Sequence, residues 1–184
     1  KRLADLKLTS VFETIEKRHC YRGGFKPDPV PRKDLVKIVE CGIKAPSGCN
    51  AQTTSFVIVD DPALIAAIAQ HVDRQVVREA RGIIVCLIDH KQVYKELSFG
   101  AEDCAAAIEN MLLAITALGY ATVWIDGALR VDDISREIGK ILKVPDNLQV
   151  RVILPIGHPA QPVATREKLP FDQRAWFNAY GAKA

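Results

Sequence analysis

Two short segments near the amino terminus carry side chains suited to binding an anion and a polar ring. The first contains Arg18 and Arg22, two guanidiniums four residues apart, and the second contains the amides of Asn50 and Gln52 just after Pro46. Arginine binds phosphate through paired N–H bonds, while Asn and Gln pair with ring carbonyl and NH groups. Together the segments suggest a phosphorylated heteroaromatic ligand. The alternative, which composition alone favours, is a solvated basic helix end followed by an ordinary polar loop.

The composition is that of a folded globular protein. The chain has 184 residues, of which 48% are hydrophobic and 26% charged, enough for one domain with a full core. We therefore expect a single domain over residues 1–184. The formal net charge of +3 is too small to indicate a nucleic-acid partner, and no block of basic residues supports one.

The cysteines and histidines show no pattern of a metal site. Five cysteines and four histidines are present, without a CxxC pair or the spacing of metal ligands. An odd number of cysteines is more typical of reduced thiols in a cytosolic protein than of a disulfide framework. No signal peptide or membrane span is visible, so we expect a cytoplasmic protein with no membrane contact and no metal.

Hydrophobic periodicity predicts helices and strands in mixed order. Helices are expected over 11–17, 31–44, 62–70, 99–118 and 132–142, and strands over 56–60, 83–89, 122–126 and 150–156. Asp61 and Asp132 are expected to cap the helices that follow them. Because strict βαβ alternation is lacking, the pattern favours an α+β domain around one sheet.

The helix predicted over 99–118 is apolar nearly all the way round, which requires burial on several sides. A chain of this length has limited room for a wholly central helix, so part of the surface is expected to meet another subunit. A plain core helix fits this feature equally well. The tail after Pro159 carries aromatic side chains that cannot form a core alone, and a partner subunit is a good candidate to cover it.

Other chemistry is mostly excluded. The chain has no GxGxxG turn, no GxxxxGK[ST] phosphate loop and no GxSxG elbow. Cys49 could be a nucleophile in principle, but a cysteine in Gly-Cys-Asn is more often a small packed residue.

Six segments, taken in order, resemble the nitroreductase family of FMN-dependent oxidoreductases. They lie at 17–22, 45–52, 109–120, 124–127, 155–159 and 166–170. Each is weak alone, but their order and spacing are specific, and the resemblance covers nearly the whole chain. It implies a mostly antiparallel central sheet flanked by helices, a homodimer with a long interface helix, and an extended C-terminal tail.

The resemblance also implies which residues hold the FMN phosphate. Arg18 matches the first phosphate-binding arginine of the family, and Arg166 and Lys168 match the tail cations that complete the site. His19 and Cys20 fall within the first phosphate-binding turn. A phosphate dianion needs several fixed donors, which these residue types provide.

Around the flavin ring, the resemblance implies Arg22 and Gly127 as the catalytic positions. Arg22 matches the basic residue beside the N1/O2 edge, where a guanidinium stabilises the negative charge of reduction. Gly127 matches the position whose backbone N–H faces N5, with Asp126 next to it. Asn50 matches the amide that meets the flavin, and Gln52 lies beside it. In this family the second subunit supplies part of each site.

Three positions depart from the family pattern. Cys20 stands where many members have serine, and Thr53-Thr54 stands where Pro-Trp often follows the glutamine. Both bear on FMN affinity. The segment between 89 and 100 is short, and its candidate aromatics to cap a substrate are Tyr94 and Phe99. The sequence therefore does not predict the identity of the substrate.

The sequence therefore predicts a homodimeric FMN-dependent oxidoreductase. It would use NADH or NADPH to reduce nitroaromatics, quinones or similar acceptors by a ping-pong mechanism. One alternative is a flavin-binding protein on the same fold that stores, senses or delivers flavin. Another is a relative of the flavin-destructase or dehalogenase type.

Overall fold

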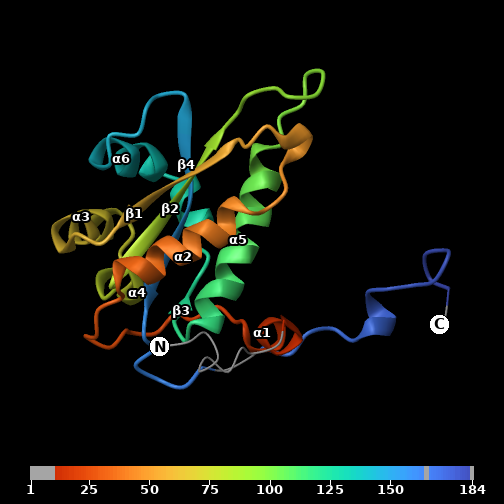
Figure 1. The fold of residues 1–184 in the computed structure, drawn as a ribbon, viewed down its shortest axis with the longest axis horizontal. Helices are drawn as coiled ribbons and strands as arrows, with labels where there is room; N and C mark the ends of the chain where they lie inside the picture. The colour runs from red at the N-terminus through yellow and green to blue at the C-terminus, as the bar shows by residue number, and fades with distance from the viewer. Residues whose placement is uncertain (1–10, 164–165, 183–184) are drawn as a thin grey trace.

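A four-stranded sheet forms the centre of the protein. The computed structural model describes residues 11–163 and 166–182. The strands are β1 (Thr54–Val59), β2 (Gly82–Asp89), β3 (Ala121–Thr122) and β4 (Leu148–Gly157). Their order is β1-β2-β4-β3, and each neighbouring pair is antiparallel (Figure 1). The predicted antiparallel sheet is thereby confirmed.

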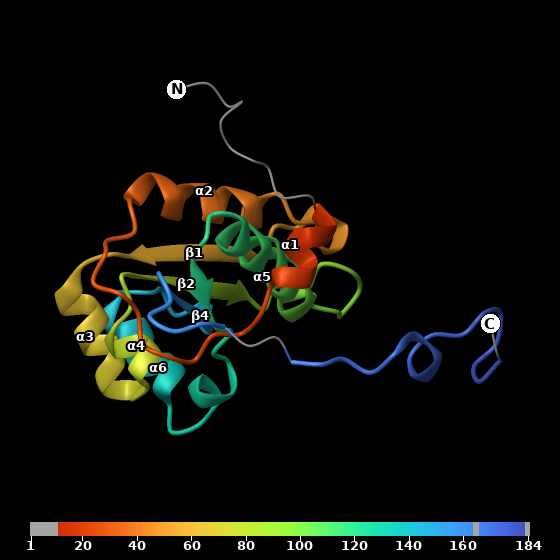
Figure 2. The ribbon, with the colours of Figure 1, turned by 90° about the horizontal axis from the view of Figure 1, so that it is seen from below.

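Helices lie on both faces of this sheet (Figure 2). One face carries α2 (Arg32–Ile43) and α5 (Gly100–Ala117), with α1 (Val11–Lys17) against α5. The opposite face carries α3 (Pro62–His71), α4 (Gln75–Arg78) and α6 (Ile134–Ile141). Short 3-10 turns are η2 (Gly48–Asn50), η3 (Gly127–Arg130) and η4 (Phe171–Gln173). This arrangement confirms the α+β class.

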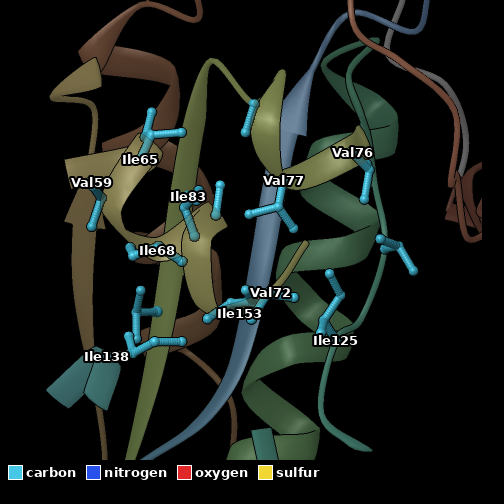
Figure 3. Close-up of a cluster of buried hydrophobic side chains, with 14 of the residues drawn as sticks. Val59, Ile65, Ile68, Val72, Val76, Val77, Ile83, Ile125, Ile138 and Ile153 are labelled. Carbon is cyan, nitrogen blue, oxygen red and sulfur yellow. The ribbon is translucent and has the colours of Figure 1, made fainter. Parts of the chain in front are cut away.

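Alternating side chains of β2 divide the core into two clusters, as expected for a strand buried on both faces. Ile83 and Val85 join the cluster beneath α3, α4 and α6 (Figure 3). Ile84 and Cys86 join the cluster beneath α2 and α5. Burial, with a contribution from the nearby Cys104 thiol, raises the pKa of the Cys86 thiol well above its usual value.

The third strand that the sequence predicts is shorter than expected. β3 ends at Thr122, and one further bridge joins Ile125 to Ile153 in the same register. In that register Val123 faces Pro155, which has no N–H to donate to the ladder. The pairing is therefore interrupted, and the continuous strand expected over 122–126 is wrong beyond Thr122.

Of the two aspartates predicted to cap helices, the structure confirms one and not the other. Asp61 accepts a hydrogen bond from Ala63 N at 2.8 Å, which confirms the start of α3. The helix expected from Asp132 begins at Ile134 instead, because Asp132 and Asp133 are left-handed, with φ of 51° and 56°. No side-chain cap is formed there, so that expectation is wrong.

The tail from 166 to 182 runs away from the sheet and its helices in both views (Figures 1 and 2). Its aromatic rings contact one another: Trp176 and Tyr180 lie 4.1 Å apart between centroids, and Phe171 and Phe177 lie 6.3 Å apart. Tyr180 is still 88% exposed. An extended tail was predicted, and its position on a partner stays a prediction.

No helix within the described ranges is long and apolar enough to cross a membrane.

Candidate functional site

The loop at 47–52 is anchored to α5 by a buried carboxylate. Asp103 Oδ1 accepts a hydrogen bond from Gly48 N at 2.7 Å, and Oδ2 accepts one from the Thr53 hydroxyl at 2.6 Å. Asp103 is only 5% exposed. Ser47 Oγ also accepts a bond from Gln52 N at 3.0 Å. These contacts hold both ends of the loop in place.

Within this loop the backbone is strained. Cys49, Asn50 and Gln52 have φ of 52°, 53° and 52°, in the left-handed region that costs energy for residues with a Cβ. The amide side chains of Asn50 and Gln52 are exposed and have no hydrogen-bond partner among the described residues. The loop therefore exposes two amide side chains without partners, on a backbone that its anchoring hydrogen bonds hold in the left-handed conformation.

Phe99 closes one side of the loop. A Cβ added at Gly48 would overlap the Phe99 ring, so glycine is required for this close approach. Tyr94, the other aromatic that the sequence singles out, is half exposed in a tight turn with Leu97. Phe99 thus supports the loop, while the role of Tyr94 in capping a substrate stays a prediction.

The turn after α1 carries the first group of predicted phosphate ligands. Arg18 Nε lies 3.4 Å from Glu109 Oε1 on α5. His19 Nδ1 lies 2.6 Å from Lys17 O, and its buried Nε2 has no partner among the described residues. Cys20 is exposed. This turn has one cation held against α5 and one buried nitrogen without a hydrogen-bond partner among the described residues.

Arg22 and Gly127 both have groups available to a ligand. Arg22 is exposed and forms no ion pair within the described part of the chain. The backbone N–H of Gly127 likewise finds no acceptor there. A Cβ added at Gly127 would meet nothing within 4 Å. The side chain of Asp126 is occupied, because Arg130 and Arg151 both donate to it.

Three long-range contacts place these segments near one another. Glu109, which meets the α1 turn, and Asp103, which holds the 47–52 loop, are six residues apart on α5, about 9 Å along a helix axis. Tyr21 N donates to Thr122 O at 2.8 Å, which ties the same turn to β3, the strand before Gly127. The structure therefore gathers the α1 turn and the loop on α5.

The tail cations are not part of this grouping. Arg166 and Lys168 are exposed on the tail, which extends away from α1 and α5 (Figure 2). Their predicted place beside Arg18 stays a prediction.

Several residues of the site were not predicted from the sequence. No role was predicted for Asp103, Arg130 or Arg151, although two of them carry a signal. Asp103 is a carboxylate in a helix whose buried face is otherwise apolar, and Arg151 is a lone charge in an apolar strand. A charge in such a position is rarely buried without a partner.

Apart from a hollow of about 430 Å³ beside α3 and α4, two hollows of similar size lie outside the loop. One, of about 440 Å³, lies beside α6, and its cations Arg130, Arg136 and Lys140 are already paired with carboxylates. The other is an apolar groove of about 430 Å³. It is lined by Val11, Thr14, Cys41, Lys44, Asn110, Leu113, Ala114 and Ala117 of α1, α2 and α5. We refer to it as the α1–α5 groove.

Known proteins resemble this chain over most of its length. It is 29% identical over 128 residues to an Archaeoglobus fulgidus protein provisionally named NADH dehydrogenase/NAD(P)H nitroreductase, covering 69% of this chain and 73% of that protein. It is 28% identical over 173 residues to an iodotyrosine deiodinase of Thermotoga neapolitana, covering 83% and 90%. A solved FMN-dependent nitroreductase of Clostridium difficile has a TM-score of 0.78 at 24% identity, covering 91% and 98%.

The model of the nitroreductase family matches residues 15–85 and 80–158. These ranges include the α1 turn, the 47–52 loop, α5 and Gly127. The match agrees with the shared fold of the solved neighbour. This chain belongs to the nitroreductase family.

Proposed function

We propose that the protein is an FMN-dependent oxidoreductase that uses NADH or NADPH to reduce small acceptors such as nitroaromatics or quinones. The observation that carries the proposal is the 47–52 loop, with its three left-handed residues and two free amides held by Asp103. Backbone strain persists where surrounding structure enforces it, and it is concentrated at ligand sites.

The residues present fit FMN. Asn50, Gln52 and the Gly127 N–H offer the unpaired polar groups that a flavin ring needs. Arg18 and Arg22 offer cations, and the Archaeoglobus fulgidus relative is named for NAD(P)H chemistry. When bound, FMN accepts a hydride from NADH or NADPH and delivers electrons to the acceptor.

The roles of the chain's own groups follow from their chemistry. Arg18 binds the phosphate, while Arg22 stabilises the negative charge that reduction places near N1/O2. His19 donates Nδ1–H to Lys17 O, which orients its ring in the proposed phosphate-binding turn. Gly127 offers a backbone N–H that cannot titrate.

A homodimer completes the proposed site. Val11, Phe12 and Ile15 of α1 are exposed next to the α1–α5 groove. Exposed apolar patches of this kind mark protein interfaces. In the dimer, the tail of the second subunit covers this face and brings the cations at Arg166 and Lys168 to the phosphate.

One cleft is proposed to serve both substrates in turn. The described residues contain no second nucleotide-binding motif, and a Cβ added at Gly127 would meet nothing within 4 Å, so a ligand can approach this backbone closely. NAD(P)⁺ would leave before the acceptor enters, which gives ping-pong kinetics.

The test begins with the absorption spectrum of the purified protein and titration with FMN, FAD and riboflavin. We expect a yellow protein with about one FMN per subunit and a preference for FMN over riboflavin. Arg18→Ala should weaken FMN binding by about 1.5–3 kcal/mol, or roughly one to two decades. Arg32→Ala is the matched control, because Arg32 pairs with Asp60 at the start of α2, and it should leave the affinity unchanged.

Turnover is measured next with NADH or NADPH and a quinone. Parallel double-reciprocal lines and loss of the yellow colour with nicotinamide alone are expected. A colourless protein that takes up no FMN would contradict the assignment of FMN as the cofactor. Intersecting double-reciprocal lines would contradict the proposal that both substrates use one cleft in turn. FMN binding without any NAD(P)H oxidation would leave a flavin-storage protein.

Reductive dehalogenation is a second candidate, favoured by the similarity to the deiodinase of Thermotoga neapolitana. Release of iodide from iodotyrosine by the dithionite-reduced protein would support it. Quinone turnover without iodide release would exclude it.

A further inference from the structure

The carboxylate of Asp126 is clamped by two arginines from different elements. Arg130 donates from Nε to Oδ1 at 2.6 Å and from Nη2 to Oδ2 at 2.5 Å. Arg151 of β4 donates from Nη1 to Oδ1 at 3.0 Å. The Arg151 and Asp126 side chains are 20% and 19% exposed. Paired bonds of this type fix orientation as well as charge, so the Asp126 side chain has little freedom.

The strand β4 is irregular where Arg151 leaves it. Cys86 pairs with Val152 and Leu87 pairs with Val150, so Arg151 is the extra residue of a β-bulge. A bulge re-aims a side chain and is frequent beside functional sites. The residues on both sides of Arg151 are buried, and the bulge lets its guanidinium reach Asp126.

The clamp acts on the peptide bond that carries the Gly127 N–H. Asp126 has φ of −128° and ψ of −58°, outside the commonly populated regions. Its carbonyl accepts a hydrogen bond from Leu129 N at 2.8 Å. The C=O and N–H of a trans peptide point in opposite directions, so this bond directs the Gly127 N–H out of the N-terminal end of η3, where it has no acceptor among the described residues.

We infer that Arg130 and Arg151 are positioning residues that hold Asp126, aim the Gly127 N–H at the flavin N5 edge, and neutralise the carboxylate beside it. The inference rests on the proposed function, which assigns Gly127 to that edge. An uncompensated carboxylate there would oppose the negative charge that two-electron reduction brings to the ring. Two guanidiniums around one carboxylate leave a local excess of one positive charge instead.

The test measures the two-electron reduction potential and the affinity of bound FMN in Arg151→Gln, Arg151→Lys and the Arg130→Gln/Arg151→Gln double variant. In the double variant we expect the equilibrium for reduction to fall about tenfold, equivalent to about 30 mV for a two-electron couple. Arg151→Gln alone should have a smaller effect. Arg151→Lys should recover part of it, because lysine keeps the charge but not the planar fork.

Adding Asp126→Asn to the double variant separates charge from structure. This third change removes the carboxylate charge, so the potential should return toward that of the unmodified protein. Arg136→Gln is the matched control, because Arg136 pairs with Asp133 on the surface of α6; it should change neither quantity. Thermal unfolding of the FMN-free variants records any purely structural effect.

Two results would overturn the inference: a double variant with an unchanged potential, or one whose lowered potential Asp126→Asn fails to restore. A fall in thermal stability without a change in potential would likewise assign the clamp to structure alone. Failure of the proposed function is distinguishable, since the unmodified protein would then take up no FMN before any variant is compared.

Discussion

The two faces of the sheet differ in how completely this chain covers them. Under α3, α4 and α6, an apolar cluster includes Ile68 and Ile138 (Figure 3). Surface charges nearby, such as Glu137 and Lys140, are paired. On the other face, Phe12 of α1 is 79% exposed beside the α1–α5 groove. The first face is completed by contacts within the chain. The second carries the α1 turn and the 47–52 loop of the candidate site and depends, in our proposal, on FMN and a second subunit.

Left-handed backbone occurs on both faces, so it does not by itself mark a site. At Asp132 and Asp133 it precedes α6 on the surface, and aspartate tolerates this conformation relatively well. At Cys49 and Gln52 it affects residue types that tolerate it less well, in a loop fixed by the buried Asp103. The strain enforced by Asp103, rather than positive φ alone, distinguishes the 47–52 loop, which we propose binds the flavin.

The largest expected effect comes from removing the tail after Val163. Arg166 and Lys168 would be lost together, costing about 3–6 kcal/mol of FMN binding, or roughly two to four decades of affinity. Sedimentation should also show a monomer, since the exposed face loses its cover. Fluorescence titration with FMN measures the first effect.

A chain ending at Pro170 is the matched control for this truncation. It keeps both cations and removes the aromatic rings, so it separates phosphate binding from dimer contacts. If the chain ending at Val163 bound FMN as tightly as the full chain, the tail would have no part in the site.

An intermediate effect is expected from Asp103→Asn. Its carboxylate accepts two hydrogen bonds from the loop region, and an asparagine can accept only with one oxygen. We expect a cost of about 1–3 kcal/mol in stability together with weaker FMN binding. Urea unfolding and FMN titration measure the two quantities.

Two further substitutions serve as comparisons for Asp103→Asn. Glu102→Gln changes an exposed carboxylate one residue away and should alter neither quantity. Ile68→Ala, on the closed face, should cost about 2–5 kcal/mol in stability and leave FMN affinity intact. A loss of affinity in Ile68→Ala equal to that in Asp103→Asn would remove the distinction between the faces.

The smallest effect concerns Tyr120, which packs in the cluster beneath α2 and α5. Burial, and then its hydrogen bond to Asp34 at 2.7 Å, raise the pKa of Tyr120 to about 12. An unfolded tyrosine titrates near about 10. The unfolded chain therefore loses the proton first, so this contribution is present below about pH 10 and is lost as the pH rises toward 12.

Urea unfolding from pH 9 to 12 tests this expectation, with Tyr120→Phe as the comparison. The unmodified protein should lose more stability across the window than Tyr120→Phe, which has no phenolic proton. Parallel pH profiles would show that Tyr120 is as accessible as an ordinary surface tyrosine, and that this end of the second face is open as well.

Most elements were predictable because their signals are local. The range predicted for α1 matches the structure, and β2 and α5 differ by single residues at their ends. The four-residue α4 was not predicted, because it is too short to show a helical period. β3 was overestimated because Pro155, more than 30 residues later, breaks its ladder. One domain over 1–184 stays a prediction.

The sequence alone determined the residue types of the site and the family to which they belong, because guanidiniums, amides and a glycine at fixed spacings are readable without coordinates. Only the tertiary structure decided what holds them. Asp103 reaches Gly48 across 55 positions, and Arg151 reaches Asp126 across 25 through a bulge. Such contacts depend on which elements pack together and on a one-residue irregularity in strand register. Neither feature produces a periodic pattern of residues that could be recognised in the sequence.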